Sequence, residues 1–122
     1  MTRVIAPILA LALLAAFGLS QNTAPRATHT IAQIRANPVY DQRVVVRGQV
    51  VRQIDRNDFL MRDATGQIEV GASRRAPLSL PVGQTVTLEG EVDTNDRGQV
   101  ELDVLRYWLP NGQVVVVPQD DR

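Results

Sequence analysis

The chain has 122 residues, of which 44% are hydrophobic, and this is enough apolar material for one packed domain. It contains no cysteine, which excludes disulfides, thiolate metal sites and cysteine nucleophiles. Thirteen basic and thirteen acidic residues give a formal net charge of zero at pH 7, so the overall charge gives no general drive toward nucleic acid or an anionic membrane.

The first 20 residues are typical of a secretory signal peptide. Arg3 precedes an uncharged apolar run over residues 4–19, which is short for the roughly 30 Å hydrocarbon core of a membrane but suits a signal-peptide core. The small residues Gly18 and Ser20 predict cleavage after Ser20. We therefore expect a periplasmic or secreted protein with no stable membrane span after cleavage. An uncleaved N-terminal anchor is the alternative.

A polar linker and a short helix are expected next. Residues 21–27 are polar and contain a proline, as linkers do. Within residues 28–37, Ile31 and Ile34 have the three-residue spacing of a helix with one apolar face. Thr28 or Thr30 can cap the start of this helix, and the Asn-Pro pair at its end stops it.

From residue 42 the apolar residues alternate, which predicts a long strand with one buried face. Val44, Val46, Val50 and Ile54 share the parity expected to be buried. Gly48 has the same parity and indicates a bend or bulge in the middle of the strand.

A hairpin over residues 58–72 follows, with strands at 58–63 and 67–72. Its corner contains Asp63 and Gly66, and we expect the Asp63 carboxylate to accept backbone N–H groups of the turn. Arg62 is expected on the opposite face, where a carboxylate or solvent meets it. Asp63 and Gly66 are therefore predicted to be structural turn residues.

The second half of the domain contains another hairpin. Residues 73–83 include two prolines and predict a connecting loop. A strand over 85–92, a turn over 93–98 and a strand from residue 100 follow. A short last strand is expected at 114–117, before a polar tail at 118–122.

Five strands of this length, the first one long and carrying a glycine, predict an all-β domain over residues 28–117. The predicted architecture is a small five-stranded OB-fold barrel with a short N-terminal helix. In such a barrel the first strand pairs with the fourth. An SH3-like barrel or a small sandwich is the alternative.

Four motifs follow one another along this predicted barrel. They are a glycine-containing strand end, an RD-x-T-G-x-I-x-V hairpin, a GEVD segment and a VELDV segment, at residues 48–54, 62–70, 90–93 and 100–104. In their order, and behind a signal peptide, they resemble the bacterial periplasmic OB-fold (BOF) stress-tolerance proteins, the YgiW/YdeI group. The resemblance covers residues 28–108. It departs at 73–83, where relatives often have an aromatic-rich, charged loop, and beyond residue 108.

The resemblance implies an exported, non-catalytic binding protein that needs no cofactor. Its implied role is tolerance of envelope stress, through binding a small cationic ligand or an envelope partner. An envelope scaffold that binds another protein through a barrel edge remains an alternative. The residues agree with the absence of catalysis, since the chain has only one histidine, His29, beside the expected helix.

A nucleic-acid-binding OB module is a further alternative. Single strands need aromatic platforms and a positive groove. The mature chain has four aromatic residues, and the adjacent Tyr107 and Trp108 are expected to point to opposite faces of a strand. Acidic residues on strands three to five offset the arginines on strands one and two, so this reading is disfavoured. The four aromatic residues are Tyr40, Phe59, Tyr107 and Trp108.

Carboxylates gather on one face of the predicted strands three to five. Parity sets Glu89 and Glu91 of one strand across from the carboxylates of the next, where like charges repel, and Arg47 is expected to offset them. This face could bind a divalent metal, a polyamine or a basic peptide, or it could be a solvated face paired with arginines. Its candidate ligand-binding residues are Glu69, Glu89, Glu91, Glu101 and Asp103.

Overall fold

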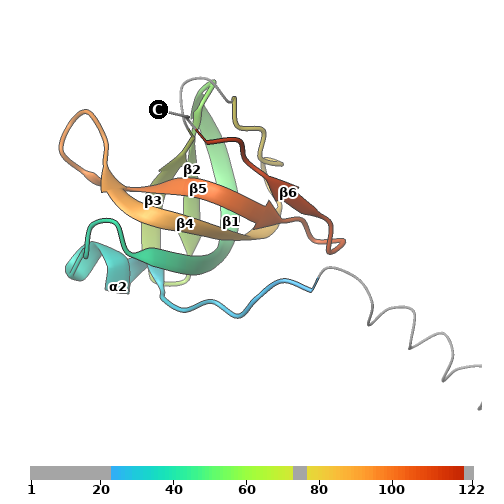
Figure 1. Ribbon diagram of the computed structural model, residues 1–122, viewed down its shortest axis with the longest axis horizontal. Coiled ribbons are helices and arrows are strands. Elements are labelled where there is room, and N and C mark those ends of the chain that lie inside the picture. Colours follow the sequence, from blue (N-terminus) through green and yellow to red (C-terminus); the bar gives the residue numbers. More distant parts are fainter. Residues whose placement is uncertain (1–22, 73–76, 120–122) are drawn as a thin grey trace, which may run out of the picture.

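The computed structural model describes residues 23–72 and 77–119. Within these two ranges it contains one helix and six strands, arranged as a barrel with the helix beside one end (Figure 1). The elements are α2 (Ile31–Ala36), β1 (Arg43–Asp55), β2 (Asp58–Asp63), β3 (Gly66–Gly71), β4 (Thr85–Thr94), β5 (Val100–Trp108) and β6 (Val114–Val116). The expected signal peptide lies outside the described residues.

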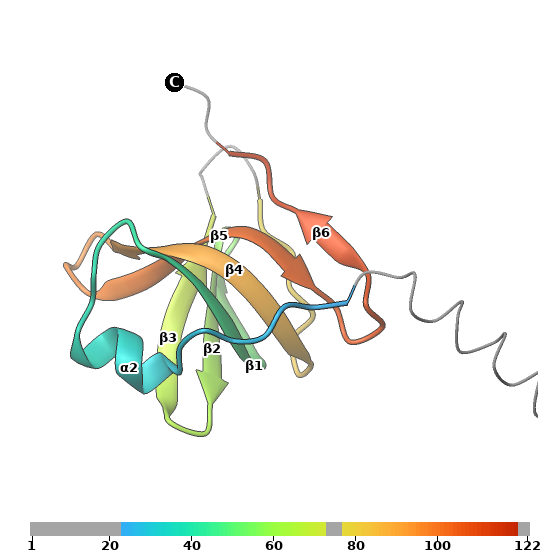
Figure 2. The same ribbon diagram turned by 60° about the horizontal axis from the view of Figure 1, so that its bottom comes forward.

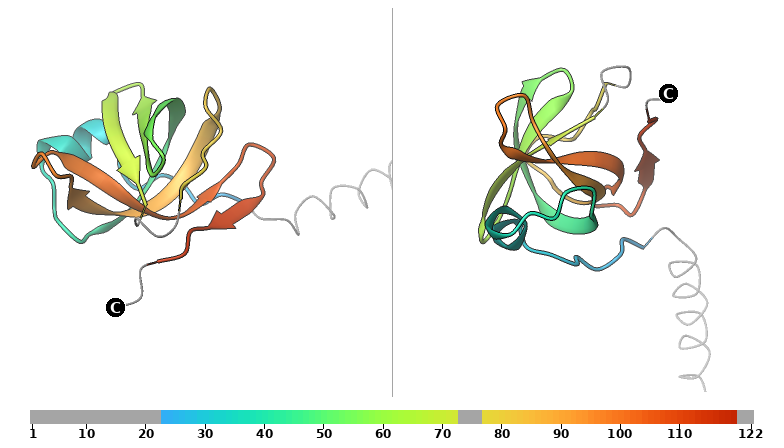
Figure 3. Two further views of the ribbon diagram at one scale, coloured as in Figure 1. Left: turned by 90° about the horizontal axis from the view of Figure 1, so that it is seen from above. Right: turned by 60° about the vertical axis from the view of Figure 1, so that its left-hand side comes forward.

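The strand order closes the barrel. The sheet runs β3-β2-β1-β4-β5-β6, and a parallel pairing between β3 and β5 joins its two sides. The five-stranded OB-fold prediction is therefore confirmed, including the antiparallel pairing of the first strand with the fourth. β6 pairs only with β5 and lies outside the closed barrel (Figure 3).

Strand β1 changes partner at its middle, and Gly48 makes this change possible. Gln49 is aligned with Thr85 of β4 and also with Arg62 of β2. A Cβ atom at Gly48 would collide with the carbonyl oxygen of Arg62. The predicted bend therefore has a steric cause, the close approach of β2 to the backbone of β1.

The prediction for Ile54 is wrong. The alternation of β1 holds through Val50, which is fully buried. The pairing with β2 then has two irregularities, between Val50 and Arg52 and between Gln53 and Asp55. The first inserts one residue before Ile54 and turns the following side chains to the other face. Ile54 itself lies within the second and is 39% exposed.

The helix begins at residue 31, behind the second of the two predicted caps, and packs against β3 at one end of the barrel (Figure 2). Thr30 is its N-cap and forms a reciprocal capping box with Gln33, which satisfies two backbone N–H groups. Ile31 and Ile34 are both buried in the core, as their spacing predicts.

The loop before β4 and the segment after β6 also supply core residues. Leu78, Leu80 and Val117 are all at most 5% exposed. Within residues 23–72 and 77–119, the structure contains no helix long and apolar enough to cross a bilayer.

Candidate functional site

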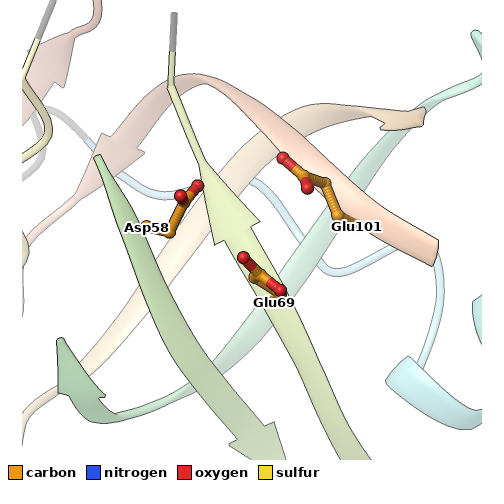
Figure 4. A group of neighbouring side chains, drawn as sticks. All are labelled: Asp58, Glu69 and Glu101. Carbon is orange, nitrogen blue, oxygen red and sulfur yellow. The ribbon is translucent and has the colours of Figure 1, made fainter. Parts of the chain in front are cut away.

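Three carboxylates from neighbouring strands converge at one end of the barrel (Figure 4). The parallel pairing of β3 with β5 sets Glu69 opposite Glu101. The β2–β3 hairpin sets Asp58 opposite Gly71, two residues beyond Glu69. As a result, one carboxylate oxygen from each of Asp58, Glu69 and Glu101 lies within 4.8 Å of the others.

Gly71 leaves the space that the Asp58 carboxylate occupies. A Cβ atom at position 71 would collide with Oδ1 of Asp58 and would lie 3.1 Å from Oε2 of Glu101. The glycine is not required for backbone conformation, because its φ lies outside the left-handed region. Its role is therefore to make room for the two carboxylates.

The three residues line a pocket of about 350 Å³ between the β1–β2 turn and the β4–β5 loop. This acidic pocket is rich in negative charge, with seven carboxylates and one guanidinium, that of Arg97. The carboxylates belong to Asp55, Asp58, Glu69, Asp93, Asp96, Glu101 and Asp103.

Crowding and burial change the acidity of two of these groups. Burial, together with the negative charges of Asp58 and Glu69, raises the pKa of Glu101 to about 7. Burial likewise raises the pKa of Asp58 to about 6, with contributions from a hydrogen bond to Asp55 and from nearby charges. Both shifts mean that negative charge is disfavoured here unless positive charge is supplied.

The β4–β5 loop supplies part of that positive charge to Glu69. Nη2 of Arg97 lies 3.2 Å from Oε1 of Glu69, and the Asn95 side-chain amide donates to the same oxygen at 3.1 Å. Asn95 also organises the loop, since its side-chain Oδ1 accepts the backbone N–H groups of Arg97 and Gln99. Glu101 and Asp58 receive no such cationic partner among the described residues.

The structure divides the predicted acidic face into two groups. Glu69, Glu101 and Asp103 line the acidic pocket. Glu89 and Glu91 do not: Glu89 is 3.1 Å from Nε of Arg106, and both glutamates lie within 4 Å of Arg43.

Two expected contacts of this face differ from the prediction. Arg43 takes the place expected for Arg47, because Arg43 is aligned with Glu91 whereas Arg47 is aligned with Thr87. The β4–β5 register differs too: parity predicts that Glu89 or Glu91 lies opposite Glu101. Instead, Glu91 is aligned with Asp103, and Asp93 with Glu101.

The turn role of Asp63 agrees with its contacts. Its Oδ1 accepts the backbone N–H groups of Thr65 at 2.7 Å and Gly66 at 3.1 Å, as expected for a turn. Its Oδ2 accepts the N–H of Ile31 at 2.9 Å, a contact the sequence did not predict. Burial acts to raise the pKa of Asp63, but these hydrogen bonds and that from the Thr65 hydroxyl lower it overall. Arg62 meets an amide and not a carboxylate, since its Nε donates to Gln49 at 3.1 Å.

Asp58 is the site residue that sequence reasoning missed. The signal for it was present in the hairpin, because a two-residue loop that pairs Asp63 with Gly66 also pairs Asp58 with Gly71. Gly71 lies two positions from Glu69 and opposite Asp58. A glycine opposite an acidic residue leaves space for the carboxylate to lie over the neighbouring strand.

Two of the four aromatic residues named above are buried and unavailable to stack on bases. Phe59 and Tyr107 are 2% and 4% exposed, and the Tyr107 hydroxyl donates to the carbonyl of Ser79 at 2.8 Å. Tyr107 and Trp108 point to opposite faces of β5, as predicted. His29 lies apart from the acidic pocket, with its Nδ1 2.8 Å from the Thr28 hydroxyl.

Comparisons with known proteins agree with the fold. A family model described as "Bacterial OB fold (BOF) protein" matches residues 15–107. Among solved structures, the chain is similar to one described as the structure of the hypothetical protein YgiW from E. coli, with 29% identity and a TM-score of 0.55. That match covers 66% of this chain and 87% of the other. No protein with a curated description matches the chain.

Proposed function

The chain belongs to the bacterial OB fold (BOF) family, and from this membership we propose that it is a binding protein that holds a small cationic ligand in its acidic pocket. The observation that carries the proposal is the convergence of Asp58, Glu69 and Glu101 within 4.8 Å. Two of these groups have raised pKa values because their negative charges are crowded and partly buried. A bound cation would remove that repulsion. The repulsion that is relieved would contribute favourably to the free energy of binding.

The size of the pocket favours an organic cation. A volume of about 350 Å³ corresponds to roughly ten water molecules, which is more than a single ion fills. An ammonium group of a polyamine or of a basic peptide side chain can donate to all three carboxylates. A divalent metal is the competing cation, because hard cations also prefer several oxygen ligands.

The remaining parts of this proposal are export and a role without catalysis. The apolar N-terminal run behind Arg3 supports export to the periplasm, where envelope stress is the context that the family resemblance implies. A non-catalytic role is supported by the composition of the chain, which has one histidine and no cysteine.

Calorimetric titration of the mature chain with spermidine, a cationic peptide and calcium tests ligand binding. We expect heat with spermidine or the peptide, and at least about tenfold weaker binding in Glu101→Gln and Asp58→Asn, because each variant removes a charge-assisted hydrogen bond. Glu91→Gln is the matched control, since Glu91 is partly exposed and pairs with Arg43. Absence of heat with all three ligands would overturn the proposal, and binding of calcium alone would replace the organic cation by a metal.

Cell fractionation with N-terminal sequencing of the mature protein tests export. We expect the protein in the periplasmic fraction, with a chain that begins at Gln21. A full-length chain in the cytoplasm would remove the envelope context without affecting the ligand proposal.

A further inference from the structure

A second groove lies beside the acidic pocket, on the outer face of β1, β2 and β3. It has a volume of about 270 Å³. Its lining includes the apolar side chains of Ile54 and Leu60, the carboxylate of Glu69 and three guanidinium groups, those of Arg35 of α2, Arg52 of β1 and Arg97 of the β4–β5 loop. We call it the arginine groove. It therefore combines apolar surface with an excess of positive charge.

Two of its three guanidinium groups are available to a ligand. Arg97 is already bound to Glu69 at 3.2 Å. Arg35 and Arg52 are exposed, and neither forms a salt bridge within the part of the chain that the structure describes. Guanidinium groups bind carboxylate and phosphate oxygens with pairs of parallel hydrogen bonds, so the groove suits an oxyanion.

Part of the apolar lining results from the irregular pairing of β1 with β2, which leaves Ile54 39% exposed. An exposed isoleucine in the lining of a groove favours a ligand with a short apolar portion next to its charged group. A bare inorganic anion would leave this surface in contact with water.

The arginine groove and the acidic pocket are continuous. Ile54, Glu69 and Arg97 line both. A long polyanion that followed the arginine groove would next meet the seven carboxylates of the acidic pocket, where like charges repel it. A short ligand with one group of each sign meets an opposite charge at both ends.

We propose that Arg35 and Arg52 form an anion subsite, and that the ligand of this protein is a small amphoteric molecule with an ammonium group in the acidic pocket and a carboxylate or phosphate in the arginine groove. The amphoteric character of the ligand rests on the proposed cation-binding function. The anion subsite stands on the two arginines alone.

NMR titrations with three kinds of probe test this proposal. The probes are an alkylamine, an alkyl carboxylate, and ω-amino carboxylates of increasing chain length, with the matching ω-amino phosphates as a second series. We expect the best ω-amino acid to bind at least about tenfold more tightly than either single-headed probe, because the second contact becomes intramolecular. The better of the two series then identifies the oxyanion.

Substitutions separate the two ends of the ligand. Arg35→Gln and Arg52→Gln should each weaken the alkyl carboxylate and the ω-amino acid about tenfold, while the alkylamine is unaffected. Arg56→Gln is the matched control, because Arg56 is also exposed but lines neither site. The same affinity for the alkylamine and the ω-amino acid, unchanged in both variants, would overturn the proposal and leave cation binding intact.

Two other outcomes are also decisive. Binding of the alkyl carboxylate, lost in Arg52→Gln, without any binding of the alkylamine would support the anion subsite and overturn the cation-binding function. Salt-dependent binding of a single-stranded oligonucleotide, lost in the same variant, would overturn the amphoteric ligand in favour of nucleic acid.

Discussion

Gly71 determines whether the carboxylate of Asp58 can lie against that of Glu101. At this position the smallest side chain is needed for space and not for backbone conformation. Gly71 thus affects the geometry of the acidic pocket without contributing a polar side-chain atom to it. Substitution of Gly71 therefore tests the geometry of the pocket without removing any charge.

Gly71→Ala should weaken binding of the cationic ligand about tenfold or more, since a displacement of one ligating group costs a hydrogen bond to a charged partner. Calorimetric titration of the variant measures the change. Gly66→Ala is the matched control, because a Cβ atom there would lie 3.7 Å from Ile31, an ordinary contact. Equal affinity in both variants would show that the position of the Asp58 carboxylate is irrelevant to binding.

Asp63 has a different role at the same scale, since it joins the β2–β3 turn to the start of α2. Asp63→Ala removes acceptors from the N–H groups of Thr65, Gly66 and Ile31, and should lower the free energy of unfolding by about 2 kcal/mol. Urea unfolding measures this effect. Ligand affinity should be unchanged, because Asp63 does not line the acidic pocket. Unaltered stability would refute the structural role.

At the scale of elements, the meeting of β2, β3 and β5 gives the fold an unusual pH dependence. The pKa values of Asp58 and Glu101 are raised from 3.8 and 4.5 to about 6 and about 7. Between about pH 4 and pH 7 the folded state therefore binds more protons than the unfolded state. The stabilisation from these bound protons is fully present at low pH and is lost as the pH rises from about 4 to about 7.

Without ligand, the free energy of unfolding should fall as the pH rises through this window, and Glu101→Gln should flatten the dependence. Urea unfolding at several pH values in the presence of a chelator measures both. Asp63 acts with the opposite sign, because its pKa is lowered: its contribution is present above pH 3.8 and is lost as the pH falls through its folded value. A slope that is the same in wild type and Glu101→Gln would contradict the assignment.

The elements also show what the sequence could predict. The β2–β3 hairpin was predictable because a short turn determines the register of both strands. The exposure of Ile54 was not, because irregular pairings within β1 interrupt the alternation without a glycine or proline to mark them. The partner of Glu91 was missed for a related reason: parity fixes the face of a strand, but only the register of β1 against β4 selects Arg43 over Arg47.

The whole molecule consists of a closed barrel and an added strand. The family model ends at residue 107, and the β3–β5 pairing closes the barrel without β6. The segment beyond β5 nevertheless contributes Val117 to the core. It lines neither the acidic pocket nor the arginine groove. The added segment therefore bears on stability and not on the proposed sites.

Deletion of residues 110–122 should lower the free energy of unfolding by about 2–3 kcal/mol, the value of burying one large aliphatic side chain. The barrel and the affinity for the cationic ligand should remain. Circular dichroism during thermal unfolding and calorimetric titration measure the two effects. Loss of ligand binding from a folded truncated chain would show that the added segment participates in the site.

The parallel pairing of Glu69 with Glu101 lies on the seam that closes the barrel, so the ligand and the closure share one set of strands. Repulsion across this seam favours its local opening, and a neutralising cation opposes it. Amide hydrogen exchange of residues 69–71 and 101–103 should therefore slow when the ligand binds, while exchange along the β1–β4 ladder stays the same. In this barrel, the charge of the ligand would determine how often the β3–β5 pairing opens.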